Sequence, residues 1–447
     1  MESIKYYDLT LSQDVMYFAL KYSPKKNIVN IGTALWIEEE VNVDLLEQAI
    51  YKTIWRVDAL RLRLKKIDGV IKQYVSTEEP KKVNIVDFTN LSKKQIDDKL
   101  TGWTGTSFKY KNAELYDITI IKTARIIKAK NNLTGIYVKV NHVAMDAWGL
   151  TVFIKDVMDV YAAMIDNKEL PEAPAPFIPL IEADLAYKNS KRFNRDEEFW
   201  KEYFNKVPNY ATIDENYLGK KYRATSLRFK SKLKVITLER EKVEKITSFC
   251  KENRLSPQSV FLLGSQLYFY KLNNTDESLV NNVLARRSTV ASKKAGGMLI
   301  NILELVVKCP HDLSFLDACN KIMIDQAKLF RHGDYPYQQV MDYLQKKVGI
   351  RSGNFTDLSF TYQAAKVGSE NMLKARVQNY SNGSSGIPVY LTIIDVLGTG
   401  NLDFMFEYNL AMASEEIVDK LYSQMIKSIE IGIASPNKTL REIISEI

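Results

Sequence analysis

The residues best suited to chemistry lie in the stretch VNHVAMDAWG, residues 140–149. The chain has three histidines among its 447 residues, and His142 follows a segment in which apolar and polar side chains alternate. This two-residue period predicts a strand and places His142 on its buried face, at the strand end. Asp146, Trp148 and Gly149 follow in a pattern typical of a turn. A neutral imidazole in this position can accept a proton at neutral pH.

Other kinds of site find little support around this motif. Zinc needs three or four ligands, whereas His142 and Asp146 supply two and the remaining histidines lie in unrelated contexts, so we expect no metal. The sequence has no G-x-S-x-G elbow and no phosphate loop or dinucleotide fingerprint. His142 is therefore either a general base that acts on a substrate's own nucleophile or a core histidine that serves packing alone.

The composition describes a globular protein large enough for two lobes, because 46% of its residues are hydrophobic and its length exceeds the usual limit for one core. The net charge of +8 is spread over lysine doublets and forms no dense basic run, so we expect no nucleic-acid partner. Without a signal peptide or a membrane-spanning run, and with three cysteines at unpaired spacing, we expect a cytoplasmic protein without a membrane span.

Strands and helices alternate along the chain, which predicts an α/β (α+β) fold. The first part contains strand patterns at residues 29–37, 60–64, 70–75, 116–127 and 135–141, with a turn near residues 131–132. Asn42 caps a helix, and a second helical pattern covers residues 150–165. The proline-rich segment LPEAPAPFIPL then predicts a linker at residues 171–180 between a lobe at 1–170 and a lobe at 181–447.

The second part continues the alternation. Helices are predicted around residues 195–204, after the cap and first-turn proline Ser256-Pro257, and after Ser414. Strands are predicted at residues 391–396 and 402–408. The composition of SNGSSG, residues 381–386, predicts a mobile loop.

These motifs, taken in order, resemble those of the condensation domains of nonribosomal peptide synthetases, in the chloramphenicol acetyltransferase-like superfamily. The family's His-His-x-x-x-Asp-Gly stands here as Asn141-His142-x-x-x-Asp146-Ala147. The opening, central and closing segments are also similar to family motifs, and they retain Gln13, Met16, Tyr17, Arg56, Leu60, Arg61, Arg63, Arg287, Gly297, Asn301, His332, Tyr335 and Pro336.

The resemblance implies two acetyltransferase-like lobes in a V-shaped pseudo-dimer with a central channel. It makes His142 the catalytic general base or orienting residue, without a covalent enzyme intermediate. Asp146, Arg287, Asn141, Trp148 and Gly149 would support the site, with Arg287 in a bidentate pair with Asp146 that pins the His142 loop to the second lobe. Asn301 and Arg61 would line the channel or contact the other lobe, and His332 would be structural.

The implied reaction is acyl transfer from a thioester on a carrier protein to an amine acceptor, which forms an amide. The phosphopantetheine arm would belong to the substrate, so no permanently bound cofactor is expected. We expect a monomer that meets its carrier in trans if it is a stand-alone condensation domain, and the alternative that it is excised from a larger synthetase stays open. Two alternatives stay open: a coenzyme A-dependent O- or N-acyltransferase of the same superfamily, and a catalytically silent carrier-docking domain.

One departure from the family motif carries a structural expectation. Ala147 replaces the family's glycine, and if the turn needs a positive φ there, alanine costs on the order of 1 kcal/mol. Asn141 replaces the first histidine, with little expected chemical cost.

Overall fold

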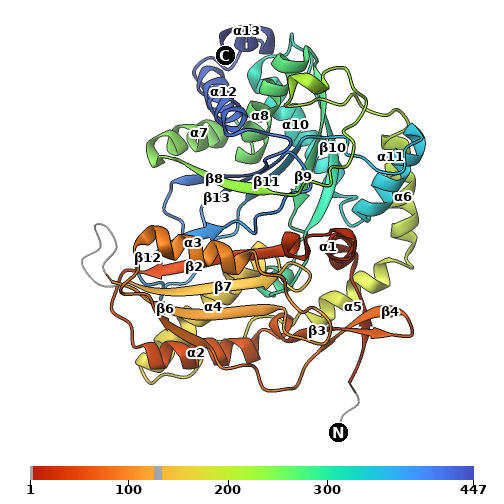
Figure 1. Ribbon diagram of the computed structural model, residues 1–447. Coiled ribbons are helices and arrows are strands. Elements are labelled where there is room, and N and C mark those ends of the chain that lie inside the picture. Colours follow the sequence, from red (N-terminus) through yellow and green to blue (C-terminus); the bar gives the residue numbers. More distant parts are fainter. Residues whose placement is uncertain (1–3, 125–132) are drawn as a thin grey trace.

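The computed structural model describes residues 4–124 and 133–447 and has a mixed α/β architecture (Figure 1). A five-stranded sheet lies in the lower half of Figure 1 and a six-stranded sheet in the upper half. A third, small sheet has the order β1 (Tyr7–Asp8), β4 (Val70–Val75), β3 (Leu62–Ile67). The predicted mixture of strands and helices is confirmed, and the V-shaped arrangement with a central channel stays a prediction.

The five-stranded sheet carries the His142 motif. Its order is β12 (Ala375–Tyr380), β2 (Asn30–Ile37), β7 (Thr134–Asn141), β6 (Tyr116–Lys122), β5 (Asn84–Asp87). Alternate apolar residues of β7 pack with α2 (Val43–Arg56) and α4 (Ala147–Ile165). On the other face Tyr137 meets Trp103 of α3 (Lys93–Thr104), with 5.6 Å between ring centroids. This alternation fits a strand between two layers of helices.

The local predictions for this half agree well with the structure. Strand β2 covers residues 30–37, and the Asn42 side chain accepts hydrogen bonds from the first backbone N–H groups of α2. Strand β6 ends at Lys122, earlier than predicted. The predicted turn at residues 131–132 lies outside the described residues.

The six-stranded sheet has the order β10 (Asn301–Lys308), β9 (Glu277–Leu284), β11 (Leu358–Gln363), β13 (Val389–Ile394), β14 (Leu402–Asn409), β8 (Ser231–Leu238). Its upper face in Figure 1 is covered by α7 (Arg240–Glu252), α8 (Pro257–Asn273), α10 (Phe315–Phe330), α12 (Glu415–Ala434) and α13 (Leu440–Glu446). Ser256 and Ser414 cap α8 and α12 as predicted. The remaining helices are α1 (Leu11–Tyr22), α5 (Ile178–Tyr187), α6 (Lys191–Tyr203), α9 (Val290–Lys294) and α11 (Tyr337–Val348).

A segment from the second part of the chain completes the first sheet. Strand β12 pairs antiparallel with β2 over six residues. The following SNGSSG segment is fixed, because Asn382 Nδ2 donates to the carbonyls of Ile28 at 3.1 Å and Asn30 at 3.0 Å. The expectation of a mobile loop is therefore wrong, since polar side chains that favour flexibility in isolation here satisfy backbone groups of the other half. The division into 1–170, 171–180 and 181–447 stays a prediction and does not describe this crossover.

The proline-rich segment is held against the first half at two points. Arg56 Nη2 donates to the carbonyl of Pro171 at 2.8 Å. The Asp58 carboxylate accepts the backbone N–H of Phe177 at 2.8 and 2.9 Å, just before α5 begins at Ile178. The last residues of the predicted linker are therefore helical.

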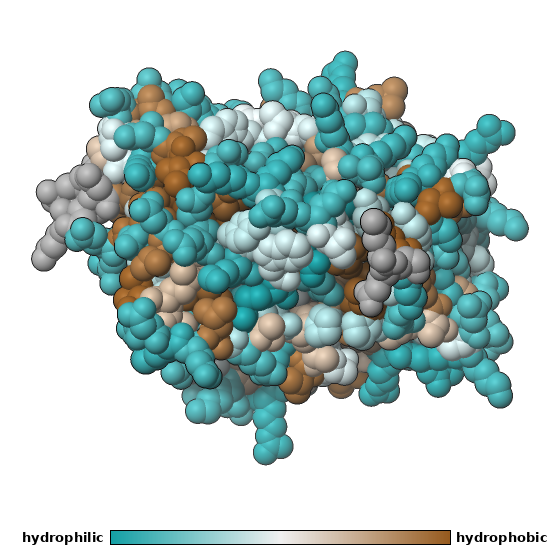
Figure 2. All heavy atoms as spheres, turned by 90° about the horizontal axis from the view of Figure 1, so that it is seen from below, coloured by the Kyte–Doolittle hydropathy of each residue, from teal (hydrophilic) through white to brown (hydrophobic). Residues whose placement is uncertain are grey.

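The face that carries α2, seen from below in Figure 2, is largely polar and has hydrophobic residues in separate patches. A groove of about 980 Å³ follows α2 and is lined by Tyr51, Trp55 and Leu170, among others. We refer to it as the α2 groove. No helix within the described ranges combines the length and the apolar character needed to cross a membrane.

Candidate active site

His142 stands in a tight turn directly after β7. Its backbone N–H donates to the carbonyl of Val29 at 2.7 Å. The preceding Asn141 is fully buried, and its Oδ1 accepts the N–H of Val143 at 3.0 Å. Among the described residues its Nδ2 finds no hydrogen-bond partner. Asn141 therefore shapes the turn through its oxygen, as asparagine does in an Asx turn.

Helix α1 supports the turn from a second side. Gln13 is completely buried, and its Nε2 donates to the carbonyl of Val143 at 3.1 Å and to Gln73 Oε1 at 2.8 Å. The same side chain closes a capping box with Thr10 at the start of α1. Gln13 belongs to a segment that is similar to a family motif, but nothing in the sequence predicted its contact with the His142 turn. Nothing in the sequence predicted a role for Gln73 either.

His142 is half-buried. Burial lowers the pKa of His142 below its ordinary value, while the Asp146 charge and the residue's own backbone carbonyl partly oppose this shift. Among the described residues Nδ1 has no hydrogen-bond partner of good geometry. The ring is therefore predominantly neutral at pH 7.

Asp146 is the N-cap of α4. Its Oδ1 accepts the N–H of Gly149 at 2.8 Å, and its Oδ2 accepts the N–H of Leu299 at 3.0 Å. Arg287 Nη2 donates to Oδ1 at 2.8 Å and to Oδ2 at 3.1 Å. The side chains of Asp146 and Arg287 are 1% and 0% exposed. The predicted contact is present, and Asp146 makes its hydrogen bonds to these groups rather than to the His142 ring.

The pair is not the bidentate fork that we expected. A single nitrogen of Arg287 reaches both carboxylate oxygens, because the rest of the guanidinium serves backbone carbonyls. Its Nη1 donates to Ser292 at 2.6 Å and to Ala295 at 2.7 Å, and its Nη2 also donates to Gly297 at 3.0 Å. Arg287 therefore organises the loop at residues 292–297 as well as binding Asp146.

The first turn of α4 lies directly against this loop. Trp148 Nε1 donates to the carbonyl of Lys293 at 3.1 Å, and the Trp148 ring lies 5.7 Å from the Arg287 guanidinium. A Cβ atom on Gly149 would stand 3.0 Å from the nitrogen and 3.1 Å from the oxygen of Gly297. Only glycine permits such an approach of two backbones. We call these contacts between residues 146–149 and 287–299 the joint.

The expectation of strain at Ala147 is wrong. Ala147 is the first residue of α4 and is not among the residues with positive φ. The helix begins immediately after its Asp146 cap, three residues earlier than the sequence pattern predicted. Alanine is a favourable residue in a helix, so nothing at this position reshapes the His142 turn.

Two other predicted site residues lie elsewhere. Asn301 Nδ2 donates to the carbonyls of Gly333 at 2.9 Å and Tyr335 at 2.7 Å, within the second half. Arg61 Nη1 donates to the carbonyl of Ser76 at 2.9 Å, within the first half. Neither hydrogen bond crosses between the halves, and the assignment of both residues to the channel or to a lobe contact stays a prediction.

The contacts of His332 fit the structural role that we expected for it, which stays a prediction. Its Nδ1 lies 2.8 Å from Asp196 Oδ1. Its ring stacks on Phe199, with 3.7 Å between ring centroids.

The sequence reasoning missed Arg286, which connects three segments. Arg286 has a left-handed backbone, with φ of 52°. Its guanidinium donates to Asp334 Oδ1 at 2.7 Å, Ser12 Oγ at 2.9 Å and Asp184 Oδ1 at 2.5 Å. It therefore ties α1 and α5 to the loop before α11. In the sequence, its position next to Arg287 was the one feature that could have pointed to this role.

The described residues contain no group of three or more His, Cys, Asp or Glu side chains that could hold a metal ion. The site therefore offers one neutral imidazole, held on a turn by Val29, Asn141 and Gln13, beside a rigid joint.

The family model for the condensation domain matches residues 3–446. The chain belongs to the condensation domain family. It is 26% identical over 444 residues to surfactin synthase subunit 1 of Bacillus subtilis (strain 168). It is 20% identical over 443 residues to tyrocidine synthase 3 of Brevibacillus parabrevis. The two alignments cover 98% and 99% of this condensation domain, which spans only 12% and 7% of the two relatives.

Solved structures of condensation domains share the fold. The first condensation domain of the CDA synthetase has a TM-score of 0.84 at 15% identity, with 98% of each chain covered. A mutant starter condensation domain of rhizomide synthetase RzmA, in complex with C8-CoA, has a TM-score of 0.82 at 17% identity, with 98% of this chain and 97% of that chain covered. The resemblance indicated by the motifs is therefore confirmed for nearly the whole chain.

Proposed function

We propose that this condensation domain transfers an acyl group from a carrier-bound thioester to an amine acceptor, with His142 as general base. The observation that carries the proposal is the neutral His142 ring, whose pKa is lowered by burial and which stands on a turn fixed by backbone and side-chain hydrogen bonds. A base with a pKa somewhat below the working pH is ready to accept a proton.

The proposed reaction needs no covalent enzyme intermediate. The amine nitrogen attacks the thioester carbonyl, and His142 accepts the proton that the amine loses. The tetrahedral intermediate then collapses, the carbon–sulfur bond breaks, and the imidazolium returns the proton to the thiolate. We assign the proton acceptor as Nε2, because Nδ1 is buried and has no hydrogen-bond partner among the described residues. Positioning of the two substrates supplies a large part of the rate enhancement.

We place the carrier protein on a groove between α1 and α11. This α1–α11 groove has a volume of about 500 Å³ and is lined by Phe18, Lys21, Tyr22, Lys188, Pro336, Gln338 and Gln339, among others. Phe18 and Tyr22 are 46% and 62% exposed. Exposed aromatic side chains beside lysines suit a partner with apolar and acidic groups. The opposite side of α1 supports the His142 turn through Gln13.

The decisive experiment is the His142→Ala variant in a single-turnover assay with an acyl-carrier donor and an amine. We expect the rate constant to fall by at least about 100-fold, because general-base catalysis is lost, with carrier affinity nearly unchanged. His311→Gln is the matched control, since the His311 ring hydrogen-bonds to the Thr275 carbonyl, far along the chain from the His142 motif. An undiminished rate in His142→Ala would show that His142 is not the base and that positioning of the substrates carries the reaction, whereas no transfer by the wild type would favour the silent docking role.

A second donor class has a specific observation in its favour. The similar starter condensation domain of rhizomide synthetase was solved with C8-CoA bound, so an acyl-coenzyme A donor is the alternative for this chain. Rates with the same acyl group on a carrier and on coenzyme A, at matched subsaturating concentrations, separate the two. We expect the carrier to be preferred, and Tyr22→Ala to remove that preference. Tyr51→Ala in the α2 groove is the control.

A further inference from the structure

A carboxyl group on the six-stranded sheet is buried, and no described cation contributes to its pKa. Glu304 of β10 is 1% exposed. It stands opposite Asn281 of β9 in the antiparallel pair. With the Asn281 amide oriented so that Nδ2 faces the carboxyl group, Nδ2 lies 2.8 and 2.9 Å from the two oxygens of Glu304. No cation among the described residues contributes to the pKa of Glu304.

The ionisable groups around Glu304 are tyrosines. Tyr337, the first residue of α11, is close enough that its hydroxyl lowers the pKa of Glu304, while burial, the larger effect, raises that pKa to about 8. Tyr203 of α6 senses the Glu304 charge, and Tyr390 of β13 lies near Tyr337. A protonated Glu304 can accept from Asn281 and donate to the Tyr337 hydroxyl, which satisfies all three groups without a buried charge.

We propose that Glu304 is a positioning residue which, as a neutral acid, fixes Tyr337 and the first turn of α11 against the sheet and so sets one wall of the α1–α11 groove. Pro336 and Gln338, the neighbours of Tyr337, line that groove. The groove part of this proposal rests on the carrier-docking role proposed above. Loss of the proton leaves a buried carboxylate beneath α11 with no cation to neutralise it, and this loosens the first turn.

The pKa of Glu304 determines in which direction the stability of the protein changes with pH. The folded state holds the proton more tightly than the unfolded chain, whose carboxyl has an ordinary pKa of 4.5, against about 8 when folded. Stability from this group is complete below the unfolded pKa and is lost as pH rises to the folded pKa. Relative to a Glu304→Gln variant, the wild-type folding equilibrium constant should fall by up to roughly 3000-fold between about pH 4 and pH 9.

The test is urea unfolding across this pH range, together with hydrogen exchange of residues 337–348 compared at the same pH. We expect exchange in α11 to accelerate at alkaline pH in the wild type and not in Glu304→Gln, whereas Glu304→Ala loosens α11 at every pH. Glu244→Gln, an exposed carboxyl on α7, is the control. Identical pH profiles for wild type and Glu304→Gln would overturn the proposal.

Isotope-edited infrared spectra of the wild-type protein give the answer if Glu304→Gln does not fold. A protonated buried carboxyl group has a carbonyl band that carboxylates lack, so a band that is present at neutral pH and disappears near pH 8 supports the proposal, and its absence overturns it.

The affinity for the carrier protein tests the groove part of the proposal separately. Affinity that falls at alkaline pH in the wild type alone supports the groove assignment. Equal pH dependence in both proteins overturns that part, whether or not acyl transfer by His142 is confirmed.

Discussion

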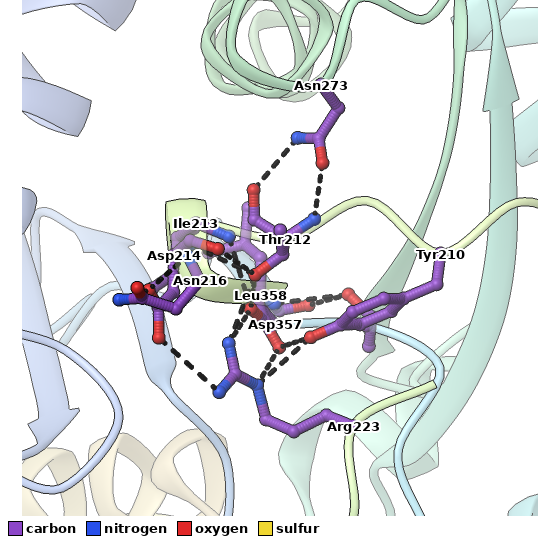
Figure 3. Close-up of polar contacts among 10 residues, drawn as sticks. Tyr210, Thr212, Ile213, Asp214, Asn216, Arg223, Asn273, Asp357 and Leu358 are labelled. Carbon is purple, nitrogen blue, oxygen red and sulfur yellow. Dashed lines mark hydrogen bonds and ion pairs between the residues drawn. The ribbon is translucent and has the colours of Figure 1, made fainter. Parts of the chain in front are cut away.

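Two of the buried arginine–aspartate pairs among the described residues lie in different surroundings. Arg223 forms a fork with Asp357, with Nε donating to Oδ1 at 2.7 Å and Nη2 to Oδ2 at 2.6 Å. The hydroxyls of Tyr210 and Thr212 donate to the same carboxylate at 2.6 and 2.8 Å (Figure 3). In the joint, by contrast, Asp146 receives one nitrogen of Arg287 and two backbone N–H groups.

The two pairs also connect different parts of the fold. The Arg223–Asp357 pair lies within the second half, where Arg223 also exchanges backbone hydrogen bonds with Asn354. The joint connects a helix cap in the first half to a loop of the second half, and that helix follows the His142 turn. A buried charge pair is therefore not by itself a sign of an active site. The role of such a pair depends on which backbone segments it connects.

The largest expected effect comes from breaking the pair that is remote from His142. Asp357→Asn leaves the Arg223 charge buried, with 2% of its side chain exposed. This should lower the free energy of unfolding by about 3–5 kcal/mol. Urea unfolding measures this cost, and Asp98→Asn in an exposed helix pair is the control. We expect the single-turnover rate of the folded fraction to be unchanged. A lower rate in the folded fraction would contradict the view that this pair serves stability alone.

Breaking the joint should cost less stability but affect the rate. Asp146→Asn should lower the free energy of unfolding by about 3 kcal/mol, because Arg287 keeps its three carbonyl acceptors. The rate should fall by roughly 10- to 100-fold as the α4 cap and the His142 turn shift. A double-mutant cycle with Arg287→Gln measures the coupling of the pair. Additive losses, or an Arg287→Gln variant with nearly unchanged stability and rate, would contradict the supporting role that we assign to the joint.

The pH dependence of the rate should differ between variants of the two buried aspartates. Because burial lowers the pKa of His142 below 6.5, the single-turnover rate should be flat near pH 7 and fall about tenfold per pH unit below that pKa. Only the neutral ring accepts a proton, so the loss occurs on the acid side. Asp357→Asn should keep this midpoint. Asp146→Asn should move it lower, because the Asp146 charge raises the pKa of His142. A common midpoint for both variants would contradict the electrostatic role of Asp146.

The smallest effect is expected at Ala147. Ala147→Gly restores the family's glycine at the first position of α4, where the backbone has no positive φ. The variant should lose about 0.5–1 kcal/mol of stability, as glycine does in helices, and keep its rate. Thermal unfolding and the single-turnover assay measure both quantities. A gain in stability or rate would show that alanine strains this turn after all.

Local chemistry in the sequence predicted much of the fold. Asn42, Ser256 and Ser414 cap helices because their side chains serve the backbone N–H groups next to them. The alternation before His142 predicted β7, and the ordered motifs indicated the family. The sequence also suggested that Asp146 meets Arg287. Each of these inferences rests on neighbours along the chain or on a motif with a fixed order.

Tertiary structure alone decided the contacts that complete the site. Gln73 supports Gln13, β12 crosses to the first sheet, and Arg286 gathers three segments. The contact partners in these cases are far apart in sequence, and side-chain type alone does not say which distant group a buried polar atom will find. Glu304 is a further case, because its burial on β10, opposite Asn281 of β9, raises the pKa of an ordinary glutamate to about 8.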